Sequence, residues 1–432
     1  MCKVKVEQRL LCAPETVRAE MHPAILLLTA VLMAPPATAH VHPHTFLTTP
    51  EIIQARGYPA QTHHVTTSDG YVLELHRIPR GRGAAGGARA STLSMSSLQN
   101  KIFNRGKNSS INTKENGKVV FLQHCLLCSS ADFVMNDPDQ ALAFILADLG
   151  YDVWLGNVRG NVYSRRHVRL SPNQREFWDY SINEIARYDV PAMLTYVREV
   201  TGSPTISYVG HSMGTAVFFA MMNYHPQINN WVRVMAAMAP VAYLHNSRFF
   251  KIYEDYLELL DVTTAKLGIE EFLMNDPGFA KLASVLCSPL SPVKFICSAI
   301  RLFLFGLNSD YVDKNYQSVI LAHNPAGISS SVMRHIRQFN VSRQFQAFDY
   351  GATRNQREYG STSPPRYSLA RVTVPVGLFW SEGDWLVDPC LCSKEALVSL
   401  RLTEDLLCPD LPQDVRQVAS ELPRSSSTTG FL

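Results

Sequence analysis

Residues 205–216 have the sequence Thr-Ile-Ser-Tyr-Val-Gly-His-Ser-Met-Gly-Thr-Ala. A short β-prone run ends in the pattern Gly-x-Ser-x-Gly, from Gly210 to Gly214, and a helix-compatible apolar run follows it. This order of strand, tight turn and helix is typical of a nucleophile elbow, in which a strained turn holds a serine side chain exposed. Flanking glycines keep side chains out of such a turn. We therefore predict that Ser212 is a nucleophile; the alternative is a chance match of a short pattern.

Strand and helix patterns alternate along the chain on both sides of this stretch. Short apolar runs bounded by turn residues predict strands, and longer runs with helical spacing predict helices. We predict a hairpin over 63–78, strands over 118–124, 151–155, 231–238 and 372–380, and helices over 140–149 and 179–200. Strands that alternate with helices predict an α/β fold with a mostly parallel sheet and helices on both faces.

The segment 242–367 interrupts this alternation, because it is helical in pattern and rich in aromatic residues. We interpret it as a mainly helical cap inserted between two strands of the sheet. Its apolar run Phe295–Phe305 must be buried or meet lipid, and we predict that it covers a pocket; ordinary core packing is the alternative. The remaining segments are an N-terminal extension with a signal peptide (1–39), a first core part (40–241) with a flexible insertion at 81–118, a second core part (368–389) and a divergent tail (390–432).

Composition and leader indicate an exported globular protein. The chain of 432 residues carries a formal charge of +3, and so balanced a charge indicates no nucleic-acid partner. An apolar run at Ala24–Met33 followed by Ala37-Thr38-Ala39 has the layout of a secretory signal peptide. The run is too short to span a bilayer, so we expect no integral membrane segment in the mature chain. A membrane anchor or a wrongly assigned start is the alternative.

Export to an oxidising compartment permits disulfides between cysteines and glycosylation of two sequons. The pair Cys287 and Cys297 is close enough to close one short loop, and we predict a disulfide there. The remaining cysteines of the mature chain, an odd number without zinc-like histidine spacing, have no predicted partner: Cys125, Cys128, Cys390, Cys392 and Cys408. Asn108 and Asn340 each begin a glycosylation sequon. We expect no metal and no cofactor.

Several motifs together resemble one family. They are Gly70-Tyr71, the runs at 121–124, 154–157 and 159–161, Gly210–Gly214, and the runs at 323–327, 349–351 and 384–389. With these motifs the chain resembles the acid lipases of the gastric and lysosomal type, which are α/β hydrolases. The resemblance implies hydrolysis of neutral lipid esters, triacylglycerol or steryl ester, at a lipid–water interface beneath a cap. It also implies a secreted or lysosomal location.

The resemblance assigns roles to individual residues. Ser212 falls on the family's nucleophile and Asp384 on its triad acid, which would orient a histidine that takes the serine proton; Asp388 is the competing choice for the acid. The backbone amides of Leu126 and Met213 fall on the family's two oxyanion donors. Because both donors are main chain, the shape of the loop matters more than the side chains.

The chain departs from the family in two places. Where the family has His-Gly-Leu-Leu, this chain has Cys125 in place of the glycine, and a positive φ there would strain the loop by roughly 1–2 kcal/mol. The triad order Ser, Asp, His requires a histidine after Asp384, yet the last histidine is His335. The tail resembles an insertion followed by a truncation. The other candidate bases are adjacent to the elbow, packed in a strand or in the cap, and none is convincing: His211, His124, His323 and His335.

These patterns favour a lipase-type ester hydrolase whose chain, as given, lacks the expected base. The alternative is a non-catalytic lipid-binding or interaction protein that keeps the pocket. A peptidase is disfavoured by the long apolar cap.

Overall fold

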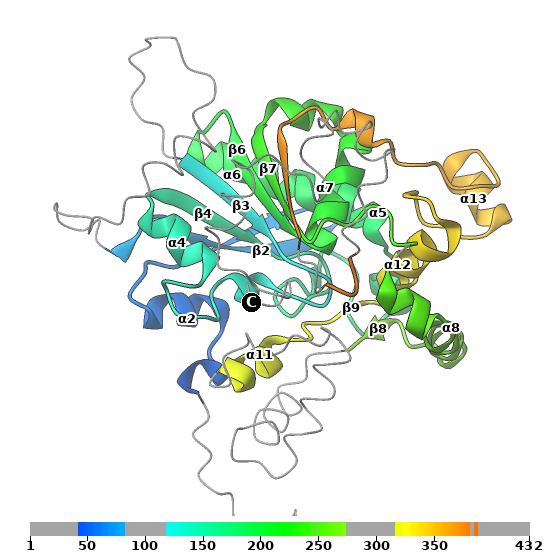
Figure 1. The fold of residues 1–432 in the computed structure, drawn as a ribbon, viewed down its shortest axis with the longest axis horizontal. Coiled ribbons are helices and arrows are strands. Elements are labelled where there is room, and N and C mark those ends of the chain that lie inside the picture. The colour runs from blue at the N-terminus through cyan, green and yellow to red at the C-terminus, as the bar shows by residue number, and fades with distance from the viewer. Residues whose placement is uncertain (1–41, 83–117, 246, 274–315, 381–383, 388–432) are drawn as a thin grey trace, which may run out of the picture.

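The computed structural model describes residues 42–82, 118–245, 247–273, 316–380 and 384–387, and its described part is built on one large sheet (Figure 1). The strand order is β1-β2-β4-β3-β6-β7-β10, and the short β5 pairs with β2. The strands are β1 (Gln61–Thr66), β2 (Tyr71–Ile78), β3 (Lys118–Gln123), β4 (Tyr151–Gly156), β5 (Arg166–His167), β6 (Ile206–His211), β7 (Val232–Met238) and β10 (Val376–Phe379).

The sheet is mostly parallel, as the alternation of strands and helices predicts. Strands β4, β3, β6, β7 and β10 are joined by parallel pairs, whereas β1, β2 and β5 pair antiparallel. The predicted hairpin is confirmed by β1 and β2, with Gly70 at φ +105°, a conformation that L side chains rarely adopt. Parallel strands β3, β6, β7 and β10 therefore present their carboxyl ends at one edge of the sheet.

Helices cover both faces, because successive side chains of a strand point to opposite sides. In β3, Val119 and Phe121 join one core cluster while Val120 and Leu122 join the other. The first cluster packs against α6 (Val190–Thr201) and α7 (Met213–Tyr224), and the second against α2 (Thr49–Ala55) and α4 (Leu142–Asp148). The predicted arrangement of helices on both faces is confirmed.

The helix predicted over 179–200 is wrong in its start and in its regularity. It begins at Ile182, where Ser181 and Glu184 form a capping box, and the chain before it is a 3-10 turn, η4 (Arg175–Trp178). The helical segment then runs through α5 (Ile182–Glu184), a π-helical turn η5 (Ile185–Asp189) and α6. Pro191 has no N–H to donate, which accounts for the break in the regular ladder just before it.

The described part of the predicted cap is mainly helical, as expected, with a small sheet that the sequence did not predict. Helices α8 (Arg248–Leu267) and α12 (Ser330–Ser342) lie side by side (Figure 1). Arg337 of α12 forms ion pairs with Glu254 and Glu258 of α8. The elements are α8 (Arg248–Leu267), α11 (Gln317–His323), α12 (Ser330–Ser342), α13 (Ala352–Tyr359), β8 (Glu271–Phe272) and β9 (Ile328–Ser329). Short 3-10 turns elsewhere are η1 (Pro43–Phe46), η3 (Ser130–Phe133), η6 (Pro226–Asn230) and η9 (Leu369–Arg371).

Several predictions concern residues outside the described ranges. They are the signal peptide, nearly all of the insertion at 81–118, the Cys287–Cys297 pair, the run Phe295–Phe305, Asn108 and the tail 390–432. Among the helices that the structure describes, none combines the length and the apolar character needed to cross a bilayer.

Candidate active site

The strand-turn-helix geometry predicted around Ser212 is confirmed. Ser212 lies between β6 and α7 at φ 51° and ψ −113°, a conformation that is uncommon for a non-glycine residue and costs on the order of 1 kcal/mol. Hydrogen bonds hold it there: its N–H donates to Met238 O at 2.8 Å, and its carbonyl accepts from the N–H and Oγ1 of Thr215 at 2.9 and 2.6 Å. The turn therefore keeps a partly exposed serine at the edge where the parallel strands end.

The glycines of the motif are required by close packing. A Cβ on Gly214 would lie 2.6 Å from Gln123 O, and a Cβ on Gly210 would lie 2.8 Å from Gly214 O. Both neighbours are backbone atoms, so no side-chain movement could relieve either contact. The absence of Cβ atoms thus lets α7 begin directly against the end of β3.

Strand pairing brings the two predicted oxyanion amides to the same edge. Strands β3 and β6 are adjacent and parallel, with Gln123 opposite Gly210, so the loops that follow them are neighbours. Met213 is the first residue of α7, and N–H groups in the first turn of a helix have no partner within it. Leu126 lies in the loop after β3, and its N–H makes no hydrogen bond to another group in the described ranges. This arrangement is suited to an anionic oxygen.

Asp384 lies after β10, at the same edge of the sheet. Strand β10 is parallel to β7, which is parallel to β6, so Asp384 and Ser212 both follow carboxyl ends of this strand set. The carboxylate is buried, and its Oδ1 accepts from the N–H groups of Leu386 and Val387 at 2.9 and 3.0 Å. These bonds hold the side chain in one orientation, as an orienting acid requires. The competing Asp388 is outside the described residues.

The buried histidines are already occupied or desolvated. Burial lowers the pKa of His124 and of His211 to about 4. His124 Nε2 accepts from Val158 N–H at 3.2 Å, so Nδ1 carries the proton and donates to Cys125 O at 2.8 Å. His335 is likewise buried and its Nε2 lies 2.9 Å from Gln346 O, while His323 Nε2 lies 3.4 Å from His44 O. That none of the four is a convincing base remains a prediction.

The structure corrects the prediction for Cys125 in two ways. Cys125 and Cys128 are joined by a disulfide, with their Cα atoms 5.2 Å apart, so they are not the unpaired thiols that the sequence suggested. The positive φ of the loop falls on Leu127, at 61°, and not on Cys125. The loop turns at Leu127 because Cys128 N–H donates to Cys125 O at 3.3 Å and Leu127 O accepts from Ala326 N–H at 2.7 Å. The strain expected of a cysteine at the glycine position is therefore absent.

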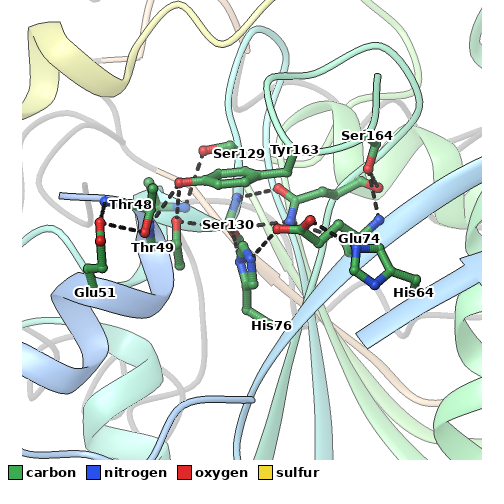
Figure 2. Close-up of polar contacts among 12 residues, drawn as sticks. Thr48, Thr49, Glu51, His64, Glu74, His76, Ser129, Ser130, Tyr163 and Ser164 are labelled. Carbon is green, nitrogen blue, oxygen red and sulfur yellow. Dashed lines mark hydrogen bonds and ion pairs between the residues drawn. The ribbon is translucent and has the colours of Figure 1, made fainter. Parts of the chain in front are cut away.

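A polar network that the sequence did not predict supports this loop (Figure 2). His76 of β2 is fully buried, with Nδ1 at 2.7 Å from Ser130 Oγ and Nε2 at 2.8 Å from Glu74 Oε1. Ser130 N–H donates to Asn157 Oδ1 at 2.9 Å, and Thr49 Oγ1 lies 3.2 Å from Ser130 Oγ. The order serine, histidine, acid resembles a catalytic relay, but Ser130 is completely buried, and no substrate could reach it. We therefore assign the network to support of the loop after β3.

One group of possible metal ligands occurs in the described part of the chain. The side chains of Cys125, Cys128 and Asp132 are buried, and their ligand atoms lie within 4.8 Å of one another. Zinc binds thiolates, and the sulfurs here are joined to each other, so this state of the site offers no thiolate ligand.

Burial of Asp132 predicts a pH-dependent stability. Desolvation raises the pKa of the Asp132 carboxyl from its usual 3.8 to about 7. The folded chain thus holds the proton of Asp132 more tightly than the unfolded chain does. The contribution of the protonated carboxyl to the free energy of unfolding is therefore fully present below about pH 4 and is lost as the pH rises toward 7. We expect the stability advantage of the native chain over Asp132→Asn to shrink between pH 4 and pH 8 by up to roughly 4 kcal/mol.

Urea unfolding at the two pH values measures this effect. Asp137→Asn is the matched control, because a hydrogen bond from Tyr316 lowers the pKa of Asp137, and the sign of its pH dependence is opposite. If the native chain and Asp132→Asn differ in free energy of unfolding by the same amount at both pH values, the raised pKa of Asp132 is contradicted.

Asn340 lies near the end of α12, and its Nδ2 donates to Glu254 Oε2 at 2.9 Å. A glycan on Nδ2 would replace one of the two hydrogens of this nitrogen and leave one that can donate to Glu254. Glycosylation of Asn340 remains a prediction.

Comparison with known proteins agrees with this geometry. The family model "Partial alpha/beta-hydrolase lipase region" matches residues 49–137, and the model "alpha/beta hydrolase fold" matches residues 118–396. "Lipase lipl-3" of Caenorhabditis elegans is 36% identical over 369 residues, which cover 84% of this chain and 85% of the relative. "Lipase member M" of Homo sapiens is 35% identical over 356 residues (82% and 77% covered), and "Gastric triacylglycerol lipase" of Homo sapiens is 33% identical over 376 residues (84% and 87% covered). The chain therefore belongs to the acid lipase family of the α/β hydrolases, together with gastric lipase.

Proposed function

We propose that this chain is a lipase-type hydrolase of neutral lipid esters, triacylglycerol or steryl ester, with Ser212 as its nucleophile. The observation that carries the proposal is the strained elbow, which holds Ser212 partly exposed beside the first N–H of α7 and the loop of Leu126. Triacylglycerol is the substrate named for the human relative gastric triacylglycerol lipase, and steryl ester is added from the resemblance to lysosomal acid lipases. We also propose that the protein is secreted or lysosomal and works at a lipid–water interface.

The site supports part of an acyl-transfer mechanism. Ser212 Oγ attacks the ester carbonyl, and the oxygen that becomes negative is stabilised by the N–H groups of Met213 and Leu126. Asp384 would orient a base that takes the serine proton, and the two backbone N–H groups that donate to its carboxylate support this role. Within the 432 residues no histidine follows Asp384, so the proton of Ser212 has no strong acceptor supplied from this position.

The organisation of the chain fits this function. We propose that residues 40–241 and 368–389 form the catalytic core, and that residues 242–367 form the cap. Helix α8 supports the cap assignment, because it exposes a row of large apolar side chains at Ile252, Tyr256, Leu259 and Leu267. Such a row of exposed apolar side chains is suited to contact with a lipid surface.

A fluorophosphonate probe tests the role of Ser212. The probe reacts with an activated serine, so we expect slow labelling whose site, located by peptide mass spectrometry, is Ser212. Ser203, a buried serine just before β6 whose Oγ donates to Thr205 O, serves as the matched control, since Ser203→Ala should leave labelling unchanged. Labelling of a different serine would contradict the assignment. No labelling after prolonged incubation, with neutral lipid still bound, would identify a non-catalytic lipid-binding protein instead.

A further inference from the structure

The loop after β3 carries a covalent bond at an unexpected place. Cys125 and Cys128 are buried and joined by a disulfide, and the ring that this bond closes contains Leu126 and Leu127. Leu126 is the residue whose N–H is proposed to bind the oxyanion. The bond thus spans the one segment of the loop whose exact placement matters for that role.

Hydrogen bonds anchor the loop on either side of this segment. Before it, Cys125 O accepts from His124 Nδ1 at 2.8 Å, and His124 is itself held by Val158 N–H. After it, Ser130 is held by Asn157 and by His76 in the network of Figure 2. The backbone between these anchors has few bonds of its own in the described structure.

Leu127, inside the ring, has a backbone conformation that needs support. Its φ of 61° is in the left-handed region, which a leucine occupies only when its surroundings hold it there. The supports are the Ala326 N–H that donates to its carbonyl, the Cys128 N–H that donates to Cys125 O across the turn, and the disulfide between Cys125 and Cys128. If the bond is broken, Leu127 can relax, and the neighbouring Leu126 N–H then turns away.

We propose that Cys125 and Cys128 are positioning residues, whose disulfide holds the Leu126 N–H in the direction of the oxyanion. This inference rests on the proposed hydrolase function of Ser212. The two cysteines act through the Leu126 amide. Where the chain differs from the family's His-Gly-Leu-Leu loop, the Cys125–Cys128 disulfide closes the loop into a ring. The site is consequently sensitive to thiol reductants.

The reduction step is an ordinary thiol–disulfide exchange. A dithiol reductant supplies two electrons and two protons, the bond between the two sulfurs breaks, two cysteine thiols form, and the reductant closes its own disulfide. Cys125 Sγ lies 3.6 Å from Asp132 Oδ2, so the freed thiol has an acceptor nearby that can keep it from returning to Cys128.

Kinetics with p-nitrophenyl butyrate test the proposal. The protein is assayed oxidised and after dithiothreitol, with EDTA present so that metal ions do not bind the freed thiols, and complete reduction is verified by alkylation and mass spectrometry. We expect reduction to lower kcat by roughly ten- to a hundredfold with KM within about twofold, because one misplaced oxyanion donor weakens transition-state binding and not substrate binding.

The control variant is Cys125→Ser with Cys128→Ser, which should have the low kcat from the start and show no further response to dithiothreitol. This variant also reports any effect of reducing other cysteines. Cys125→Gly with Cys128→Ser restores the family's glycine, and recovery of kcat in that variant would separate loop placement from a general loss of folding. An unchanged kcat in fully reduced native protein would overturn the proposal, as would finding both thiols free before reduction.

If the chain hydrolyses no ester in either the oxidised or the reduced form, amide hydrogen exchange tests whether the disulfide orders the loop. That result would overturn the proposed function of Ser212, but not the positioning of the loop. The N–H groups of Cys128 and Ser130 donate within the loop and to Asn157, so they report on its order. The proposal is supported if both N–H groups exchange faster after reduction of the native protein, and if dithiothreitol does not change their exchange rates in the double serine variant. Equal exchange rates in the oxidised and reduced native protein contradict it.

Discussion

Ester hydrolysis by the 432-residue chain is expected to exceed the uncatalysed rate by only about 10³–10⁴-fold, because no histidine follows Asp384. This residual acceleration comes from the oxyanion donors and from substrate binding. Triad members act as a unit, so Ser212→Ala should lower the residual rate by less than about tenfold. Initial rates with p-nitrophenyl butyrate measure both quantities.

Adding imidazole separates a missing base from a defective site. Imidazole can occupy the space between Ser212 and Asp384 and take the serine proton, and general-base catalysis contributes roughly 10²–10⁴-fold when the base is well placed. We expect concentrated imidazole to raise the rate of the native chain by about tenfold or more, and to leave Ser212→Ala at the background rate. Rapid hydrolysis without imidazole, abolished by Ser212→Ala, would show that another group in the chain is the base.

Replacing Arg159 with methionine is expected to destabilise the fold by about 3–5 kcal/mol, a large part of the roughly 5–15 kcal/mol typical of a native protein. Arg159 is buried and donates from Nε to Asp189 Oδ1 and from Nη1 to Asp69 Oδ2, both at 2.7 Å. Its guanidinium also lies 3.9 Å from the centre of the Tyr71 ring. The variant leaves the fully buried Asp189 without a cationic partner, since only the backbone N–H of residue 159 still donates to it, which accounts for the size of the effect.

The pH dependence of this variant identifies the cause. Burial raises the pKa of Asp189 to about 6 even with Arg159 present, and removing the cation raises it further. Arg159→Met should therefore be less unstable relative to the native chain at pH 5 than at pH 8. Arg354→Met, which breaks an exposed pair with Asp179, is the control and should cost no more than about 1 kcal/mol. Urea unfolding measures the free energy of unfolding of both variants. Equal losses for Arg159→Met and Arg354→Met would contradict the explanation that burial of the ion pair causes the large effect.

Local sequence patterns were sufficient for the elbow and the sheet. The turn at Ser212 is determined by a β-prone run, two glycines and a helical run that are neighbours in the chain. The strands β3 and β7 are determined by apolar runs of strand length. Each pairs in parallel with β6, which lies between them, because helices connect the successive strands. Asp384 was predicted as the triad acid from a contiguous motif of the family that the chain resembles, and this role remains a prediction. In each case the interactions that select the conformation act within a few residues, so the sequence reports them directly.

Tertiary contacts decided the shape of the loop after β3 and the partners of the buried polar side chains. Cys125 has an ordinary backbone conformation because the loop turns at Leu127, which an N–H from Ala326, far along the chain, holds in place. His76 is paired with Ser130, and Arg159 with Asp69 and Asp189, only because folding places distant strands and loops together. Buried polar groups must find hydrogen-bond partners wherever the fold puts them. The sequence by itself therefore determined the elbow and the layered α/β sheet, whereas the shape of the oxyanion loop and the partners of its buried polar groups were decided by contacts between segments far apart in the chain.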